Sequence, residues 1–180
     1  MPDKSPAPPV FFDIEASGLG GVPIEVGWAI PDPTSGSIET HAVLIRPDPK
    51  WQIEAHWDDA AELLHGIPLV ELRARGLAPA DVANRMNEAL AGRELYSDAP
   101  GFDRHWLQMV FDAEDSRQCF TVSTTEVHTF IGTAARNLGW SPAKCRLIMA
   151  QVMDDNPRTH RAADDARLLA ALWLAMTKES

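Results

Sequence analysis

Apolar and polar positions alternate with a period of two through much of residues 10–46, as they do along half-buried strands. An apolar run starts at Val10, and the segment from Ile24 to Ile30 places an apolar side chain at every second position. The β-rich segment 41–46 follows a stretch of turn residues at 31–37. The pattern predicts antiparallel strands joined as a meander.

Beyond residue 78 the apolar positions follow the helical period of 3.6 instead. The clearest helix opens with the capping box Ser123-x-x-Glu126 and stops at Gly139. Residues 141–156 show no pattern that assigns them to a helix or a strand. The other predicted elements are a helix between Pro79 and Gly92, a short strand at 94–97, a helix carrying Phe102, Trp106 and Val110, a strand at 119–122, and a last helix from about Arg161 to Met176.

This order of elements predicts an α/β fold in which helices cover a mixed sheet. Residues 1–9 hold four of the 14 prolines and two charges, so we expect a flexible N-terminal segment there. With 45% hydrophobic residues, a chain of 180 residues can bury one sizeable core. We therefore expect one domain over residues 10–180.

The net charge of the chain limits the kinds of nucleic acid that it can bind. Asp and Glu outnumber Lys and Arg by 26 to 16, and the resulting formal net charge of -10 argues against a protein that grips long duplex nucleic acid by charge alone. A polyanionic substrate would need metal ions or a local basic rim. No apolar run approaches the roughly 18 residues of a membrane span, so we expect a cytoplasmic protein with no membrane partner.

The stretch FDIE places two acids, Asp13 and Glu15, in an otherwise apolar strand. Residues two apart on a strand point to the same side, so these carboxylates project together. Two neighbouring anions are tolerated inside a protein when a hard cation such as Mg²⁺ lies between them. The alternative is a strand end whose acids point into solvent.

Two further acids precede or open helices. Asp103 follows the turn Pro100-Gly101, where an ordinary helix cap is the competing interpretation. Asp165 shares the apolar face of the last helix and should point inward, whereas Asp164 lies about 100° round the helix and should face water. His160 precedes Asp165 by five positions.

Taken in this order, FDIE, the later FD and His-x4-Asp resemble the DEDDh family of 3′-to-5′ exonucleases. That family includes the proofreading subunit of bacterial replicative DNA polymerase, oligoribonuclease and ribonuclease T. The segments 23–27 (PIEVG) and 64–67 (LHGI) are also similar to the family's. The resemblance implies a ribonuclease H-like fold, with a five-stranded mixed sheet flanked by helices.

The resemblance also implies roles for individual residues. Asp13, Glu15, Asp103 and Asp165 would bind two divalent metal ions, Mg²⁺ or Mn²⁺, and His160 would act as the general base. In such a site paired cations activate a water and stabilise the leaving 3′ oxygen of the phosphodiester. All four acids and the histidine are present in this chain. One departure concerns substrate positioning, since Ala99 stands four residues before Asp103, where many relatives carry an Asn, and Asp98 lies beside it.

The expected substrate is the 3′ end of short single-stranded DNA or RNA, which stacks on apolar and aromatic side chains. DNA and RNA are not distinguished by the sequence, and an association of two copies into a homodimer is left open. Two other functions compete: a catalytically silent nucleic-acid- or protein-binding subunit with this fold, and an endonuclease of the ribonuclease H type. The expected substrate contacts are Ser17, Gly18, Leu19, His65, Phe102 and Trp106.

Overall fold

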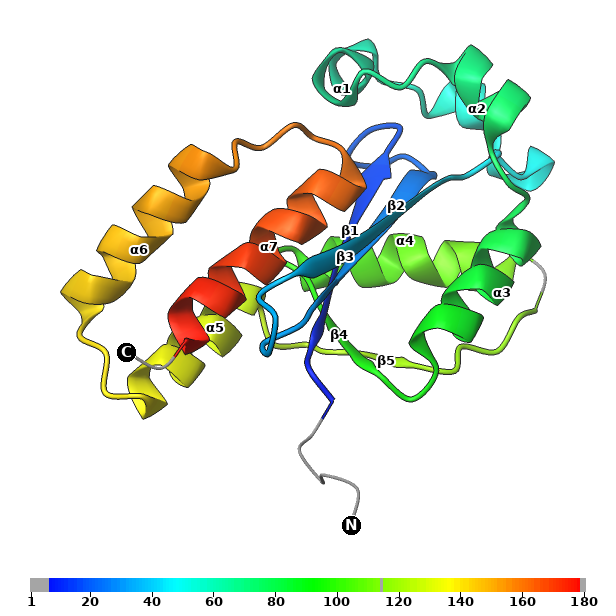
Figure 1. The fold of residues 1–180 in the computed structure, drawn as a ribbon. Helices are drawn as coiled ribbons and strands as arrows, with labels where there is room; N and C mark the ends of the chain where they lie inside the picture. The colour runs from blue at the N-terminus through cyan, green and yellow to red at the C-terminus, as the bar shows by residue number, and fades with distance from the viewer. Residues whose placement is uncertain (1–6, 114, 179–180) are drawn as a thin grey trace.

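The predicted sheet is present in the computed structural model, which describes residues 7–113 and 115–178. Five strands lie in the order β3-β2-β1-β4-β5 (Figure 1). β1 pairs antiparallel with β2, and β2 with β3, whereas β4 runs parallel to both β1 and β5. The expected five-stranded mixed sheet is thus confirmed. The strands are β1 (Val10–Ala16), β2 (Pro23–Pro31), β3 (Ile38–Leu44), β4 (Glu94–Tyr96) and β5 (Thr121–Val122).

Helices cover both faces of this sheet (Figure 1). One apolar cluster joins the sheet to α3 (Pro79–Leu90) and α4 (Pro100–Asp112), and a second joins it to α5 (Val127–Asn137) and α7 (Ala162–Thr177). α6 (Pro142–Asp155) packs half-buried residues against that second cluster. The remaining helical elements are η1 (Pro49–Trp51), η2 (Ile53–Ala55), α1 (Asp59–His65) and α2 (Leu69–Arg75).

Alternation along β1 decides which face receives which side chain. Phe12 and Ile14 are buried in the cluster with α3 and α4, and Phe11 is buried in the cluster with α5 and α7. Asp13 and Glu15 therefore lie on the Phe11 face, which α7 covers. The predicted common orientation of the two acids is confirmed.

Two predictions of helix structure need correction or completion. The N-cap of α5 is Glu126, whose carboxylate accepts from the backbone N–H of His128, so the capping box expected from Ser123 does not form. The Ser123 hydroxyl instead accepts from the backbone of Thr125. The unassigned segment 141–156 forms α6, which escaped prediction because it buries no residue fully and so has no strong apolar stripe.

The flexible N-terminal segment predicted for residues 1–9 lies partly outside the described residues, which begin at Ala7. Ala7 to Pro9 precede β1, and the carbonyl of Pro8 accepts a hydrogen bond from the Arg93 side chain at 2.7 Å. Among residues 7–113 and 115–178, no helix is long and apolar enough to cross a bilayer.

Candidate functional site

The C-terminal half of β1 and the first turn of α7 lie close together because a glycine of β2 allows the helix to approach the sheet. Asp13 pairs across the sheet with Gly27, and a Cβ at Gly27 would lie 2.2 Å from the backbone nitrogen of Ala163. Only glycine allows this approach of helix to strand. The first turn of α7, with Asp165, is thereby set down beside the acids of β1.

An ion pair between a buried acid and a half-exposed arginine holds the same junction. Glu25 is 1% exposed and lies opposite Glu15 in the sheet. Its carboxylate accepts from the Arg161 guanidinium at 2.6 and 3.0 Å and from the backbone N–H of Ala162 at 3.0 Å. Glu25 thus satisfies an amide at the start of α7, where Arg161, the N-cap, makes no side-chain cap of its own. The loop that carries His160 is anchored to β2 by these bonds.

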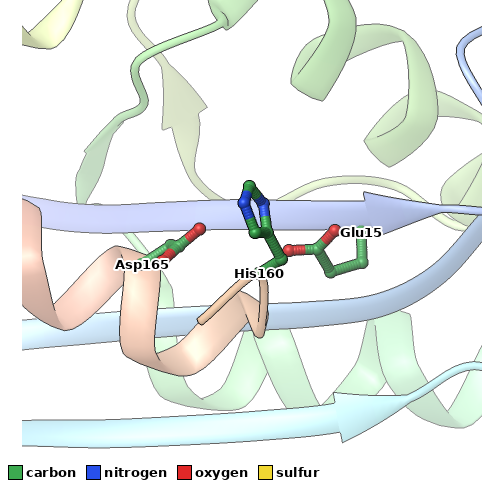
Figure 2. Close-up of side chains that lie close together, drawn as sticks. All are labelled: Glu15, His160 and Asp165. Atoms are coloured by element: carbon green, nitrogen blue, oxygen red, sulfur yellow. The ribbon is translucent and has the colours of Figure 1, made fainter. Parts of the chain in front are cut away.

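Glu15, His160 and Asp165 form the first acidic cluster. Their candidate ligand atoms all lie within 4.8 Å of one another. Figure 2 shows the two carboxylates approaching His160 from opposite sides, Glu15 from the strand and Asp165 from the helix. His160 has a φ of 54°, in the left-handed region that is sparsely populated by residues other than glycine. Such local strain is found most often at functional sites.

Asp13, Asp98 and Asp103 form the second acidic cluster, again with ligand atoms within 4.8 Å of one another. Asp103 lies in the first turn of α4 and is 2% exposed, and the N-cap of α4 is Ala99, so Asp103 is not a cap. Asp98 belongs to this cluster although the sequence did not single it out as a ligand. The available signal was its position beside Ala99, at the end of the predicted strand 94–97 and shortly before Asp103.

Burial and mutual repulsion raise the pKa values of these acids. Burial is the main cause at Asp13, whose pKa lies well above its usual range, with the charge of Asp103 adding to it. Burial, aided by the Asp165 charge, raises the pKa of Glu15 to about 7. Burial also raises the pKa of Asp103 to about 7 and, against the opposing effect of Arg158, raises that of Asp165. The acids therefore sit in a site that favours added positive charge.

The donor set suits hard divalent cations. Carboxylate oxygens are the ligands that Mg²⁺ and Mn²⁺ prefer, and two oxygens on opposite sides of Mg²⁺ are about 4 Å apart. Oδ2 of Asp103 and Oδ1 of Asp165 are buried with no hydrogen-bond partner among the described residues. An unpaired buried carboxylate oxygen is costly unless a cation or proton satisfies it. The residues present thus fit metal ions at both clusters.

Three expected substrate contacts, Gly18, Leu19 and Phe102, are at least partly exposed. Leu19 is 81% and Phe102 51% exposed, which is unusual for large apolar side chains. Gly18 has a φ of 156°, and a Cβ there would come within 3.0 Å of the Asp58 side chain. The glycine thus lets the loop after β1 lie against the start of α1.

The other three expected contacts are buried. The Ser17 hydroxyl donates to the carbonyl of His56 and accepts from the N–H of Val22, so it shapes the loop rather than facing a ligand. Trp106 is 8% exposed and donates its indole N–H to the carbonyl of Gly21. Its ring contacts the exposed ring of Phe102, with 5.7 Å between the two ring centroids. Periodicity placed Trp106 on a helix but did not reveal that its face packs on the sheet.

His65 is also buried, at 4% exposure. Its Nδ1 accepts from the backbone N–H of Ile67, and its Nε2 has no partner among the described residues. Burial lowers the pKa of His65, which favours the neutral ring with the proton on Nε2.

The predicted solvation of Asp164 is confirmed, since that residue is exposed while Asp165 is 6% exposed.

The fold is similar to those of solved exonucleases. The zinc-bound complex of E. coli exonuclease I with single-stranded DNA matches with a TM-score of 0.64 and 16% identity, over 93% of this chain and 39% of that one. Its complex with a dT13 oligonucleotide matches with a TM-score of 0.67 and 15% identity, over 97% and 42%. Exonuclease X in complex with 5′ overhanging duplex DNA matches with a TM-score of 0.55 and 20% identity, over 93% and 89%.

The chain thus spans about two fifths of the exonuclease I chains but most of the exonuclease X chain. No protein-family model matches it, and no curated protein matches it. The structural likeness extends over more than nine tenths of this chain. The predicted resemblance to the DEDDh exonucleases is therefore confirmed at the level of the fold, which is ribonuclease H-like.

Proposed function

We propose that this protein is a metal-dependent 3′-to-5′ exonuclease that removes nucleotides from single-stranded DNA or RNA. The observation that carries the proposal is the convergence of Asp13, Glu15, Asp103 and Asp165 with His160 at one end of the sheet. These acids come from β1, α4 and α7 and are up to 152 positions apart in the chain, yet they form two clusters whose members interact electrostatically with one another. The likeness to exonucleases solved with DNA supports the same activity.

The four predicted acids would hold two divalent cations, Mg²⁺ or Mn²⁺. Such ions polarise a phosphodiester and lower the pKa of an attacking water. His160 supplies the proton acceptor, because its ring nitrogen lies within 4.8 Å of ligand oxygens of Glu15 and Asp165. A neutral imidazole in that position takes a proton from a water held between these acids. Glu25 and Arg161 keep the His160 loop in place.

Substrate recognition would rest on stacking rather than on charge. Leu19 and Phe102 offer exposed apolar surface, on which nucleobases of any sequence can stack. The net charge of -10 gives little general attraction for a polyanion. We therefore expect short substrates or distributive trimming. His65 stays a predicted substrate contact, although its ring is buried.

Digestion of matched 5′-labelled DNA and RNA oligonucleotides with Mg²⁺ or Mn²⁺ tests the proposal. Products should shorten stepwise from the 3′ end, disappear with a chelator, and fail to form on a 3′-blocked oligonucleotide. Asp165→Asn should be inactive, whereas Asp164→Asn serves as the matched control. Internal cutting of the blocked substrate would favour an endonuclease, and binding without cleavage would favour a silent subunit.

A further inference from the structure

An arginine lies among the acids of the second cluster. Arg158, in the loop between α6 and α7, forms an ion pair through its Nη2 with Oδ2 of Asp98. Asp98 is itself within 4.8 Å of candidate ligand atoms of Asp13 and Asp103. One carboxylate thus faces both a guanidinium and the place where the cluster would hold a cation.

The charge of Arg158 reaches beyond its direct partner. It interacts electrostatically with Asp165 and Asp13 as well as with Asp98, so both acidic clusters feel it. Arg161, which directly follows His160 in the chain, binds the buried Glu25 instead. Arg158 is therefore the arginine whose charge opposes the repulsion among the acids of the second cluster.

The Arg158–Asp98 ion pair lies at the solvent edge of the second cluster. The side chains of Arg158 and Asp98 are 39% and 20% exposed, so the arginine is open to water while the acid is half-buried. Asp103 beside them is 2% exposed and keeps Oδ2 without a partner among the described residues. A buried unpaired oxygen next to an ion-paired acid points to a ligand that the arginine only partly replaces.

We propose that Asp98 is a fifth acid of the metal centre and that Arg158 is its internal counter-ion in the metal-free protein. A divalent cation bound by Asp13, Asp98 and Asp103 then displaces the guanidinium, because the two positive charges compete for one carboxylate and repel each other. The inference rests on the proposed function only in requiring that these acids bind a divalent cation. It adds a ligand and a competitor that the sequence did not single out.

Calorimetric titration with Mn²⁺, with thermal unfolding in parallel, tests the competition without using activity. Arg158→Gln should tighten Mn²⁺ binding by about tenfold because a competing charge is removed. The same variant should melt lower than wild type without metal, since the acids then lack their counter-ion. Arg75→Gln is the matched control: it breaks the exposed pair of Arg75 with Glu71 on α2 and should change neither Mn²⁺ affinity nor the Mn²⁺-induced rise in Tm.

Asp98→Asn tests the ligand from the other side, and it suffices if Arg158→Gln does not fold. It should weaken Mn²⁺ binding about tenfold or more, both alone and combined with Arg158→Gln. Unchanged or weaker Mn²⁺ binding in Arg158→Gln, or wild-type binding in Asp98→Asn, overturns this inference alone. Wild-type protein that binds no Mn²⁺ overturns both this inference and the proposed function.

Discussion

The two acidic clusters share one strand but differ in how they are built. Glu15, His160 and Asp165 lie at a close-packed junction, in which Gly27 allows the helix to approach and Glu25 accepts from the backbone N–H of Ala162. The cluster of Asp13, Asp98 and Asp103 is ion-paired to Arg158 in a loop. Both clusters have acids with raised pKa values, but only the first contains the predicted proton acceptor, His160, and only the second contains an acid ion-paired to an arginine.

The largest expected effect separates two adjacent acids of α7. Asp165→Asn should lower the rate of nucleotide release by several orders of magnitude, because its buried oxygen faces the site. Asp164 is exposed and accepts from the hydroxyl of Thr159, so Asp164→Asn should change the rate little. Single-turnover rates on a 5′-labelled oligonucleotide measure both effects. Equal losses of rate in the two variants would contradict the assignment of Asp165 to the site and of Asp164 to solvent.

Removal of the predicted base should have the next largest effect. His160→Ala should slow cleavage by about 10²- to 10⁴-fold. Mn²⁺-induced thermal stabilisation should survive, since the four predicted acids stay in place. Higher pH should partly restore the rate of the variant, because hydroxide then replaces the missing base. A pH–rate profile of both proteins checks this, and a variant as fast as wild type would remove His160 from the mechanism.

The junction between β2 and α7 should be sensitive to a single methyl group. Gly27→Ala would drive a Cβ into the backbone of Ala162 and Ala163 and should destabilise the fold by about 2–3 kcal/mol. Gly20→Ala is the control, since a Cβ there meets nothing within 4 Å. Urea unfolding gives both free energies. Similar values for the two variants would show that the helix does not depend on the close approach.

The smallest effect concerns pH in the absence of metal. The pKa values of Glu15 and Asp103 rise to about 7 in the folded protein, whereas they lie near 4 in an unfolded chain. Between these values the folded state binds more protons, so stability from these groups falls as pH rises through roughly 4 to 7. The metal-free Tm of Asp103→Asn should therefore fall less over this window than that of wild type.

Divalent metal should reverse this trend. The Mn²⁺-induced rise in Tm should grow with pH, because deprotonated acids bind the cation and protonated ones do not. Differential scanning fluorimetry from pH 5 to pH 8, with and without Mn²⁺, measures both effects. An Mn²⁺-induced rise in Tm that is independent of pH would mean that the acids with raised pKa values are not the metal ligands.

The local periodicity of the sequence was enough to predict the direction of several site side chains. Alternation along β1 sufficed to place Asp13 and Glu15 on one side, and the helical period sufficed to turn Asp165 inward and Asp164 outward. These inferences succeed because strand and helix geometry fix the direction of neighbouring side chains whatever they pack against. The order of the acidic motifs then indicated the fold.

Tertiary structure alone decided which distant residues meet. Arg161 binds Glu25 across 136 positions, and Arg158 binds Asp98 across 60, and no periodic pattern links such pairs. The same holds for Ser17 and Trp106, whose polar atoms are used inside the protein by His56 and Gly21. A sequence pattern reports which side of an element is apolar, but only the packed chain determines what that side touches.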